Sequence, residues 1–338
     1  MLAAGAPGEL TRDDLPTPAL LLDLDGFEAN IAKMTAYCRA ARRALRPHGK
    51  THKCPAIAAA LIRAGAVGCC AARIGEAEVF AKHGVGGLLV TTAVIGRHKI
   101  ERAIALASTR PETIFSVDDA QNVQDLNDAA EAAQQTLNLA IDLWVGERTG
   151  IPAGEPALAL ARQIVRLPHV RLAGLQAYAG QASHVIGWEA RRKVSVEAMT
   201  RAVETRGLLE RSGLECPLVT GGSTGTYNID SAIDGVTELQ PGSFLFMDLD
   251  YRRIGGQDGN GVYQDFRTSL SVVTTVVSKP SRELAIVDGG FKAFSTDKPF
   301  PPEAKTIPGL AYTWGGDEHG KLNLTMASAP VRVGDRIE

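Results

Sequence analysis

The sequence lacks any apolar run long enough to cross a lipid bilayer, for which a helix needs about 20 consecutive residues. Its first residues, 1–11, also lack the basic start and the apolar core of a secretory signal. The chain also lacks a strong excess of positive or negative charge, since its formal net charge is −2. The chain therefore offers no electrostatic attraction to nucleic acid or to an anionic membrane, and we expect neither as a partner.

Paired cysteine motifs are absent too. The chain has five cysteines and no Cys-x-x-Cys spacing; they are Cys38, Cys54, Cys69, Cys70 and Cys216. An odd number without that spacing argues against a disulfide framework and against a zinc site built on cysteine. We expect reduced thiols and a cytoplasmic location.

What the sequence does contain is a long alternation of strand and helix patterns. Short apolar runs predict strands at 44–49, 66–71, 87–92, 113–117, 137–144, 170–177, 218–221 and 237–240. Helical spacing predicts helices at 27–44, 54–64, 76–83, 99–107, 120–133, 155–165 and 189–212. Eight strands with helical crossovers predict an α/β fold, a (β/α)8 TIM barrel.

The pattern changes after about Tyr251. Residues 268–277, 283–287 and 322–326 are typical of strands without helices between them, and residues 299–308 are proline-rich and irregular. This predicts a second, mainly β domain, which the apolar stretch 19–24 is a candidate to join. We therefore divide the chain into a barrel of residues 27–250 and a β domain of residues 1–26 plus 251–338.

Cations cluster at the end of the first predicted barrel strand, where residues 45–53 read LRPHGKTHK. In a barrel of parallel strands, the chemistry lies at the carboxyl ends of the strands. A lysine held there near other cations loses its proton more readily and can attack a carbonyl group as the free amine. Two interpretations stay open from this stretch alone: a lysine that forms a Schiff base, and a basic loop that binds an anion or water.

Two glycine-containing loops follow the seventh and eighth predicted barrel strands. Residues 219–226 read VTGGSTGT, and residues 239–243 read LQPGS. Glycines allow the backbone to approach an anion closely, and successive N–H groups and hydroxyls can then surround a phosphate. Barrels often bind phosphate after these two strands, although such a cluster is also typical of a plain turn.

Residues 46–55 (RPHGKTHKCP) resemble the lysine segment of the D-threonine aldolase and D-serine dehydratase family, which are pyridoxal-phosphate (PLP) enzymes of the alanine-racemase type. The resemblance extends from about Leu15 to the C-terminus and is closest to the D-threonine aldolase branch. It implies a barrel with a β domain that contains both chain ends, and Lys50 rather than Lys53 as the residue that carries PLP. It also assigns both glycine loops to the cofactor's phosphate, through Gly222, Ser223, Thr224, Gly242 and Ser243.

Two further segments extend the resemblance. Residues 145–151 (VGERTGI) match a segment whose arginine approaches the phenolic oxygen of the cofactor, which implies this role for Arg148. Residues 174–184 (GLQAYAGQASH) imply that Tyr178 packs near the cofactor and that His184 acts as base toward the substrate hydroxyl, as a neutral histidine near pH 7 can. Taken alone, the three side chains are equally typical of a loop arginine, a strand-end aromatic and a surface histidine.

The family usually carries a late His-x-Asp or His-Cys segment that binds a divalent metal, beyond a turn like residues 333–336 (VGDR). This chain ends at Glu338, so the sequence leaves open whether the β domain continues and whether Mn²⁺, Mg²⁺ or Zn²⁺ is bound. Four positions expected to line the pocket are small, where close relatives tend to carry larger polar groups: Ala72, Thr92, Ala93 and Ala179. The side chain of the substrate is therefore open too.

The resemblance implies a PLP-dependent lyase, active as a homodimer, that cleaves D-configured β-hydroxy amino acids to glycine and an aldehyde. The runner-up is a dehydratase or aldolase acting on D-serine or 3-hydroxy-D-aspartate, which needs the same cofactor. Two alternatives lie outside this class: a non-catalytic PLP-binding protein, and a barrel aldolase that uses a lysine Schiff base without PLP.

Overall fold

The structure, a computed structural model, describes residues 11–338. By its internal contacts the chain divides into two compact units, Glu28–Arg267 and the residues up to Phe27 together with Thr268–Glu338. The predicted division at residue 250 differs from this contact-based one. Residues 251–267 stay with the larger unit because the Tyr263 hydroxyl donates to the Thr224 carbonyl oxygen (2.7 Å) and the Tyr227 hydroxyl donates to Asp265 (3.0 Å).

Eight parallel strands of the larger unit form one sheet in the order β2-β9-β8-β7-β6-β5-β4-β3. Their bounds are β2 Ala44–Leu45, β3 Cys69–Ala71, β4 Leu88–Val90, β5 Ile114–Val117, β6 Leu137–Asp142, β7 Val170–Ala177, β8 Leu218–Gly221 and β9 Glu238–Leu239. Hydrogen bonds from the Val67 N–H to the Leu45 carbonyl (2.9 Å) and from the Cys70 N–H to the Pro47 carbonyl (2.9 Å) join the two ends of this order. The sheet therefore curls into a TIM-like barrel, and the predicted α/β fold is confirmed.

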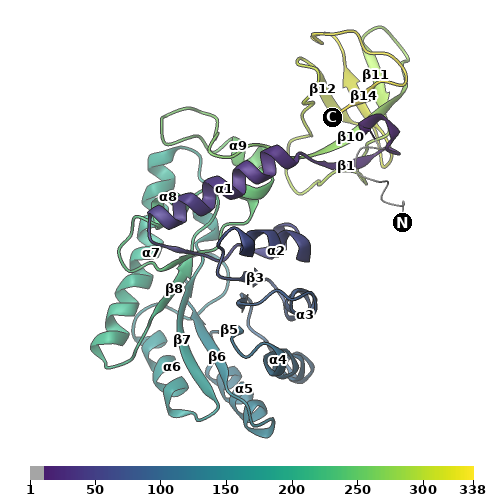
Figure 1. Cartoon of the computed structure of the whole chain (residues 1–338). Helices are drawn as coiled ribbons and strands as arrows, with labels where there is room; N and C mark the ends of the chain where they lie inside the picture. Colours follow the sequence, from purple (N-terminus) through teal and green to yellow (C-terminus); the bar gives the residue numbers. More distant parts are fainter. Residues whose placement is uncertain (1–10) are drawn as a thin grey trace. The chain divides into compact units, whose positions relative to one another are not determined.

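Helices cover the outside of this barrel, as Figure 1 shows for α4, α5 and α6. The helix bounds are α1 Leu24–Ala40, α2 Pro55–Arg63, α3 Ile74–Lys82, α4 Arg97–Thr109, α5 Ala120–Ala132, α6 Glu155–Arg166, α7 Trp188–Arg211, α8 Tyr227–Asp230 and α9 Leu249–Arg252. Short 3₁₀ turns are η1 Arg12–Asp14, η2 Gly49–Thr51, η3 Gly180–Ala182 and η4 Ser243–Leu245. The spacing of buried Ala157, Ala161 and Ile164 shows how α6 turns one apolar face inward.

The barrel strands lie where the apolar runs predicted them, but six of the eight are shorter than predicted. The first and the eighth end shortly before a proline. The first was predicted at 44–49, yet β2 ends at Leu45, because Pro47 has no N–H to donate to a ladder. His48 then makes only an isolated bridge to Cys70. The eighth was predicted at 237–240, and β9 covers Glu238–Leu239, just before Pro241. Both prolines stand where the chain leaves the sheet and enters a loop of the proposed site.

A buried ion pair joins these two short strands inside the barrel. Arg46 donates from Nε and Nη2 to the two carboxylate oxygens of Glu238, each at 2.9 Å, and from Nη1 to the Gly87 carbonyl. The Thr220 hydroxyl on β8 donates to Glu238 as well (2.7 Å). Because the two-pronged pair lies in the barrel interior, it favours one register of β2 against β9.

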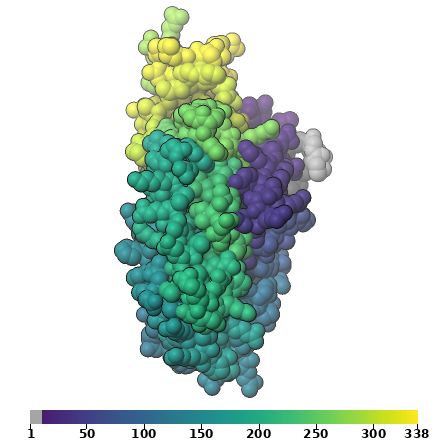
Figure 2. Space-filling view, turned by 90° about the vertical axis from the view of Figure 1, so that its left-hand side faces the viewer, coloured from purple at the N-terminus to yellow at the C-terminus, as the bar shows by residue number. Residues whose placement is uncertain are grey.

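A second buried carboxylate stands beside the loop that follows β8. The carboxylate of Asp230 in α8 accepts from the Ser195 hydroxyl of α7 (2.5 Å) and from the Thr226 hydroxyl (2.6 Å). Burial raises the pKa of Asp230 to about 6, against the lowering effect of these two bonds. The Tyr37 hydroxyl of α1 lies 2.8 Å from the Ser231 hydroxyl, which follows α8. Figure 2 shows α1 in purple next to green residues of the larger unit.

The smaller unit is an antiparallel sheet in the order β1-β10-β11-β13-β12, with β14 paired to β10. The strands are β1 Ala19–Leu22, β10 Leu270–Ser278, β11 Leu284–Val287, β12 Ala311–Trp314, β13 Gly320–Asn323 and β14 Arg336–Ile337. Its core includes Val276, Val287, Tyr312 and Leu322. The predicted β domain is confirmed, and the stretch 19–24 joins it through β1. The sequence did not predict β12 or β14.

Among the described helices, none has the length and apolar character needed to cross a membrane. The five cysteines are all unpaired, and Cys38, Cys69, Cys70 and Cys216 are buried.

Breaking the ion pair inside the barrel should be costly. Glu238→Gln leaves the guanidinium of Arg46 buried without its counter-charge, so the free energy of unfolding should fall by ~3–5 kcal/mol. Urea unfolding followed by circular dichroism measures this. Glu101→Gln, which breaks the solvent-exposed Arg97–Glu101 pair of α4, is the control and should leave the urea midpoint unchanged. Equal midpoints for the two variants would contradict the structural role of the buried pair.

Asp230 should make stability depend on pH. Because its folded-state pKa of about 6 lies above the ordinary value, the folded protein binds this proton more tightly than the unfolded chain does. The resulting stabilisation is present at about pH 4 and is lost as pH rises through about 6. Asp230→Asn removes this stabilisation. The difference in the free energy of unfolding, wild type minus variant, should therefore fall by ~2–3 kcal/mol between about pH 4 and about pH 7. A difference that stays constant with pH in urea titrations would show that Asp230 ionises as freely in the folded protein as in the unfolded one.

Candidate active site

Lys50 lies in the turn η2, directly after β2, at the carboxyl end of the barrel. The turn is tight: the N–H groups of His52 and Lys53 both donate to the Gly49 carbonyl (3.1 and 2.7 Å). Gly49 is buried, and a Cβ on it would lie 2.6 Å from the ring of Phe80, so only glycine fits. The Lys50 ammonium lies 5.1 Å from the ring centroid of Tyr178, which follows β7. The first and sixth predicted strands therefore bring these two residues together.

Lys53 has a different environment. It has a positive φ of 48°, its side chain is 68% exposed, and its ammonium lies 3.6 Å from Glu76 of α3. Lys50, and not Lys53, therefore faces the Tyr178 side chain, which comes from the other side of the barrel.

His48 is a buried neutral histidine beneath this turn. Burial, together with the nearby charges of Lys50 and Arg148, lowers its pKa to about 3. Its Nδ1 accepts from the Lys50 backbone N–H (3.3 Å), so Nε2 carries the proton and donates to the Thr91 hydroxyl (3.2 Å). That hydroxyl in turn donates to the Ala71 carbonyl (3.3 Å). The chain of bonds holds the Lys50 backbone against β3 and β4.

Arg148 lies on the same side of the barrel as Lys50. Its guanidinium carbon is 5.7 Å from the Tyr178 ring centroid, and its Nη2 is 3.5 Å from the Asp142 carboxylate at the end of β6. Asp142 also accepts from the Gln176 amide (2.8 Å) and the Thr149 hydroxyl (2.7 Å), while burial raises its pKa. Lys50 and Arg148 thus approach one tyrosine ring from two different loops.

The first glycine loop begins where β8 ends. Gly222 has φ = 76°, a conformation that favours glycine, and turns the chain out of the strand. The Ser223 N–H donates to the Thr226 hydroxyl (3.1 Å), which donates in turn to Asp230. The Thr224 hydroxyl accepts from the Phe244 N–H of the second loop (2.9 Å), so the two loops are tied to each other.

The second glycine loop packs against the lysine turn. A Cβ on Gly242 would collide with the Thr51 hydroxyl and would lie 2.9 Å from the His48 carbonyl oxygen. In the described part of the chain, the N–H groups of Thr224, Gly225, Gly242 and Ser243 donate to no protein acceptor. Unclaimed N–H groups on two loops that touch are the arrangement a phosphate needs.

His184 lies between η3 and α7, and its Nδ1 is 2.8 Å from the carboxylate of Asp250 in α9. Its ring centroid is 4.4 Å from that of Tyr251. Tyr251 is buried, and its hydroxyl lies next to Ser223 of the first glycine loop. Burial raises the pKa of Tyr251 far above its ordinary value, so the residue stays a neutral phenol.

The sequence did not predict the partners that surround the named residues: Asp250 and Tyr251 beside His184, Asp142 and Gln176 beside Arg148, and Thr91 beside His48. Position was one available signal, since Asp142 ends a predicted strand and Asp250 ends the predicted barrel. Gln176 also lies in the matched segment 174–184. The four small positions follow the ends of β3, β4 and β7, where Ala179 is buried and Ala72, Thr92 and Ala93 are half-buried. In residues 11–338, no three His, Cys, Asp or Glu side chains come together in a group that could hold a metal ion.

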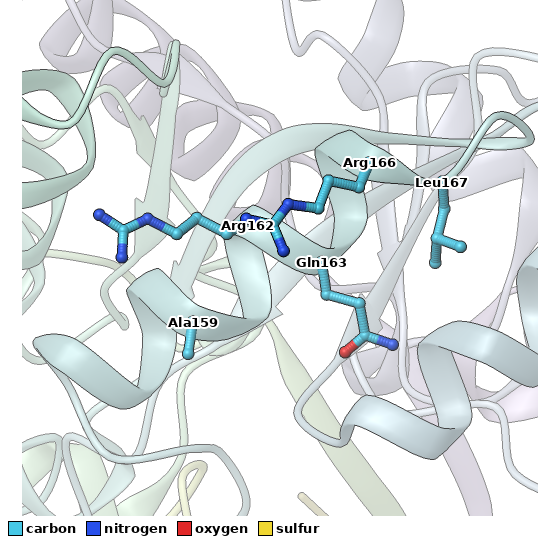
Figure 3. A pocket seen from close by; sticks show the side chains of 5 residues that line it. All are labelled: Ala159, Arg162, Gln163, Arg166 and Leu167. Carbon is cyan, nitrogen blue, oxygen red and sulfur yellow. The ribbon is translucent and has the colours of Figure 1, made fainter.

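A surface hollow of about 510 Å³ lies elsewhere, on α6. Figure 3 shows the five residues that line it: Ala159, Arg162, Gln163, Arg166 and Leu167. These residues belong to the last turns of the helix, which lead into the start of β7, whereas Tyr178 follows the other end of that strand. The hollow is therefore separate from the site around Lys50.

The chain is similar to known proteins over most of its length. Residues 22–250 match the family model "alanine racemase, N-terminal domain", and residues 269–338 match the "putative serine dehydratase domain". The chain is 39% identical over 320 residues to a D-threonine aldolase of an Arthrobacter species, which covers 94% of this chain and 82% of the relative.

Two other relatives carry related names. A 3-hydroxy-D-aspartate aldolase of Paracoccus denitrificans is 35% identical (93% of this chain, 81% of the relative). A D-threo-3-hydroxyaspartate dehydratase of a Delftia species is 31% identical (96% and 87%).

The crystal structure of a D-threonine aldolase from Filomicrobium marinum superimposes with a TM-score of 0.91 at 37% identity, over 96% of this chain and 87% of that one. The predicted family resemblance is confirmed. The chain belongs to the alanine racemase-like, fold-type III family, in the group of D-threonine aldolases and 3-hydroxyaspartate aldolases and dehydratases.

Proposed function

We propose that this chain is a PLP-dependent lyase that cleaves D-configured β-hydroxy amino acids to glycine and an aldehyde. The observation that carries the proposal is the position of Lys50. Its ammonium faces Tyr178, and the turn that holds it packs against Gly242 of the second glycine loop. A lysine amine and a phosphate cradle on adjoining loops are the two features that a phosphorylated aldehyde cofactor requires.

The residues present fit this cofactor. Gly242 allows the second loop to lie against the lysine turn, where a Cβ would collide with Thr51. The unclaimed N–H groups of both loops can hold the cofactor's phosphate together with Gly222 and Ser223. Lys50 would hold the aldehyde end, and Arg148 would stabilise the negative charge of the phenolic oxygen. Tyr178, which lies close to both cations, would pack beside the ring.

When bound, PLP withdraws electrons from the Cα atom of an attached amino acid, which weakens the bonds of that atom. The chain's own contribution to cleavage is the removal of the β-hydroxyl proton. His184 is suited to this step, because the Asp250 carboxylate 2.8 Å from its Nδ1 favours a proton on Nδ1 and thus a lone pair on Nε2. As the Cα–Cβ bond breaks, the hydroxyl oxygen becomes the oxygen of the aldehyde and its proton passes to His184.

A dehydratase is the second candidate, favoured by the 31% identity to the 3-hydroxyaspartate dehydratase. Such an enzyme removes the Cα proton and expels the hydroxyl group, and it needs the same cofactor and the same phosphate cradle. The products separate the two reactions: D-threonine yields glycine and acetaldehyde by cleavage, but 2-oxobutanoate and ammonia by dehydration. A protein that binds PLP and turns over neither D-threonine nor 3-hydroxy-D-aspartate would belong to the non-catalytic class.

Reduction with borohydride should attach PLP to Lys50. We expect a yellow purified protein that loses its visible band on reduction, with a pyridoxyl adduct on Lys50 in peptide mass spectrometry. Lys50→Ala should abolish the adduct, whereas Lys53→Ala, the matched control, should retain it. A protein that stays colourless with added PLP and gains no adduct would end the cofactor proposal. The active protein should then release glycine from D-threonine, assayed with and without Mn²⁺.

Removal of the proposed base should slow turnover without loss of cofactor. His184→Ala should lower kcat for D-threonine cleavage by ~10²–10⁴-fold, the usual contribution of a general base. The visible PLP band should be retained, because His184 is not assigned to the cofactor. His98→Ala, at an exposed histidine of α4, is the control. An unchanged kcat in His184→Ala would show that another group takes the hydroxyl proton.

A further inference from the structure

Arg191 is a fully buried arginine near the start of α7, with 0% of its surface exposed. Its guanidinium makes four hydrogen bonds, all to backbone carbonyl oxygens. Nε donates to Gly225 (2.9 Å), and Nη2 donates to Gly255 (2.8 Å). Nη1 donates to Val185 (2.9 Å) and to Ile254 (2.7 Å). Four of the five N–H groups of one side chain are thus used on three separate loops.

Each of these loops carries a residue of the proposed site. Val185 follows His184, Gly225 follows Thr224 of the first glycine loop, and Ile254 lies three residues after Tyr251 and shortly after Asp250. The Gly187 N–H also donates to the Ile254 carbonyl (2.9 Å), and the Tyr263 hydroxyl donates to the Thr224 carbonyl (2.7 Å). The three loops therefore meet around the guanidinium.

The environment of Arg191 is unusual for a buried charge. No ion pair of Arg191 is found in residues 11–338; its neighbours are the rings of Trp188 (5.6 Å) and Tyr263 (5.9 Å). The charge of Asp265 acts on it only from beyond ion-pair distance. Burial lowers its pKa from the ordinary value, yet an arginine remains charged in proteins. Burying an arginine without a direct ion pair costs free energy. Such a residue is useful where its planar, directional donors hold several carbonyls in fixed positions.

We propose that Arg191 is a positioning residue that sets the first glycine loop and the His184 loop in one fixed arrangement. The inference rests on the proposed function, because it treats the glycine loop as the phosphate site and His184 as the base. Arg191 itself touches neither cofactor nor substrate. It binds the carbonyls of Gly225 and Val185. By fixing these two backbone segments, it fixes the N–H groups of the first glycine loop and the imidazole of His184.

The test compares PLP with pyridoxal, which lacks the phosphate, in Arg191→Lys. A lysine keeps the charge but has no planar fork and cannot reach carbonyls on three loops at once. We expect the affinity for PLP to fall by about tenfold or more, which corresponds to ~1.4 kcal/mol. The affinity for pyridoxal, which depends on Lys50 and the ring contacts, should stay nearly unchanged. Arg206→Lys is the matched control, since Arg206 on the same helix donates to the carbonyl of Gly235 (3.0 Å) outside the site.

A second readout needs no cofactor. Hydrogen exchange of the unliganded protein should become faster at 182–187 and 222–227 in Arg191→Lys, but not in Arg206→Lys. If Arg191→Lys does not fold, Tyr263→Phe takes its place. That variant removes the hydroxyl that binds the Thr224 carbonyl and that also lies beside Asp265. It should lower the affinity for PLP and leave the affinity for pyridoxal nearly unchanged.

The outcomes separate the two proposals. A wild-type protein without a Lys50 adduct would end the cofactor proposal, while the exchange data would still test whether Arg191 holds the two loops. A folded Arg191→Lys that binds PLP as the wild type does, or that loses PLP and pyridoxal equally, would overturn the positioning role and leave the proposed function intact.

Discussion

The buried ion pair between Arg46 and Glu238 is the contact on which the arrangement of the site depends. It joins β2 to β9, two strands of only two residues each, whose backbone ladder alone offers few hydrogen bonds. The lysine turn follows one strand and the second glycine loop follows the other. A slip between β2 and β9 would therefore separate Lys50 from Gly242. The two-pronged geometry of the pair favours the register in which these loops meet.

Beyond the strands, the site is held together mainly by side chains that bind backbone groups of neighbouring loops. The Thr224 hydroxyl joins the two glycine loops, and the imidazole of His48 holds the Lys50 backbone. Arg191 binds the Val185 carbonyl next to His184, and Tyr263 binds the Thr224 carbonyl of the first glycine loop. Loops that leave parallel strands have no ladder partner for their N–H and C=O groups, so polar side chains have to satisfy them. The same bonds that satisfy these groups also fix the positions of the catalytic candidates.

The barrel was predictable because its strands are buried on both faces and appear in the sequence as short apolar runs. β5, β7 and β8 lie within a residue of their predicted positions. β2 and β9 are shorter than predicted because Pro47 and Pro241 follow them. The pattern of apolar residues takes no account of a proline's missing N–H. The short strand Ala311–Trp314 was not predicted, because it lies on an antiparallel sheet with alternating burial and follows an irregular proline-rich stretch. Its residue types favour a strand, but the run is only four residues long and only Tyr312 in it is buried.

For the site, Lys50 and the glycine loops stand out in the sequence, because a cation cluster and a run of glycines, serines and threonines are local patterns. By itself the sequence determined the fold class, the family, and the residue types available for a phosphate and a carbonyl group. The tertiary structure alone decided which residues surround them: Asp250 and Tyr251 beside His184, Asp142 beside Arg148, and the guanidinium of Arg191 among three loops. These contacts join segments far apart in the chain, and their existence depends on the closure of the barrel. Local patterning records which face of a segment is buried, but not which distant segment will lie against it.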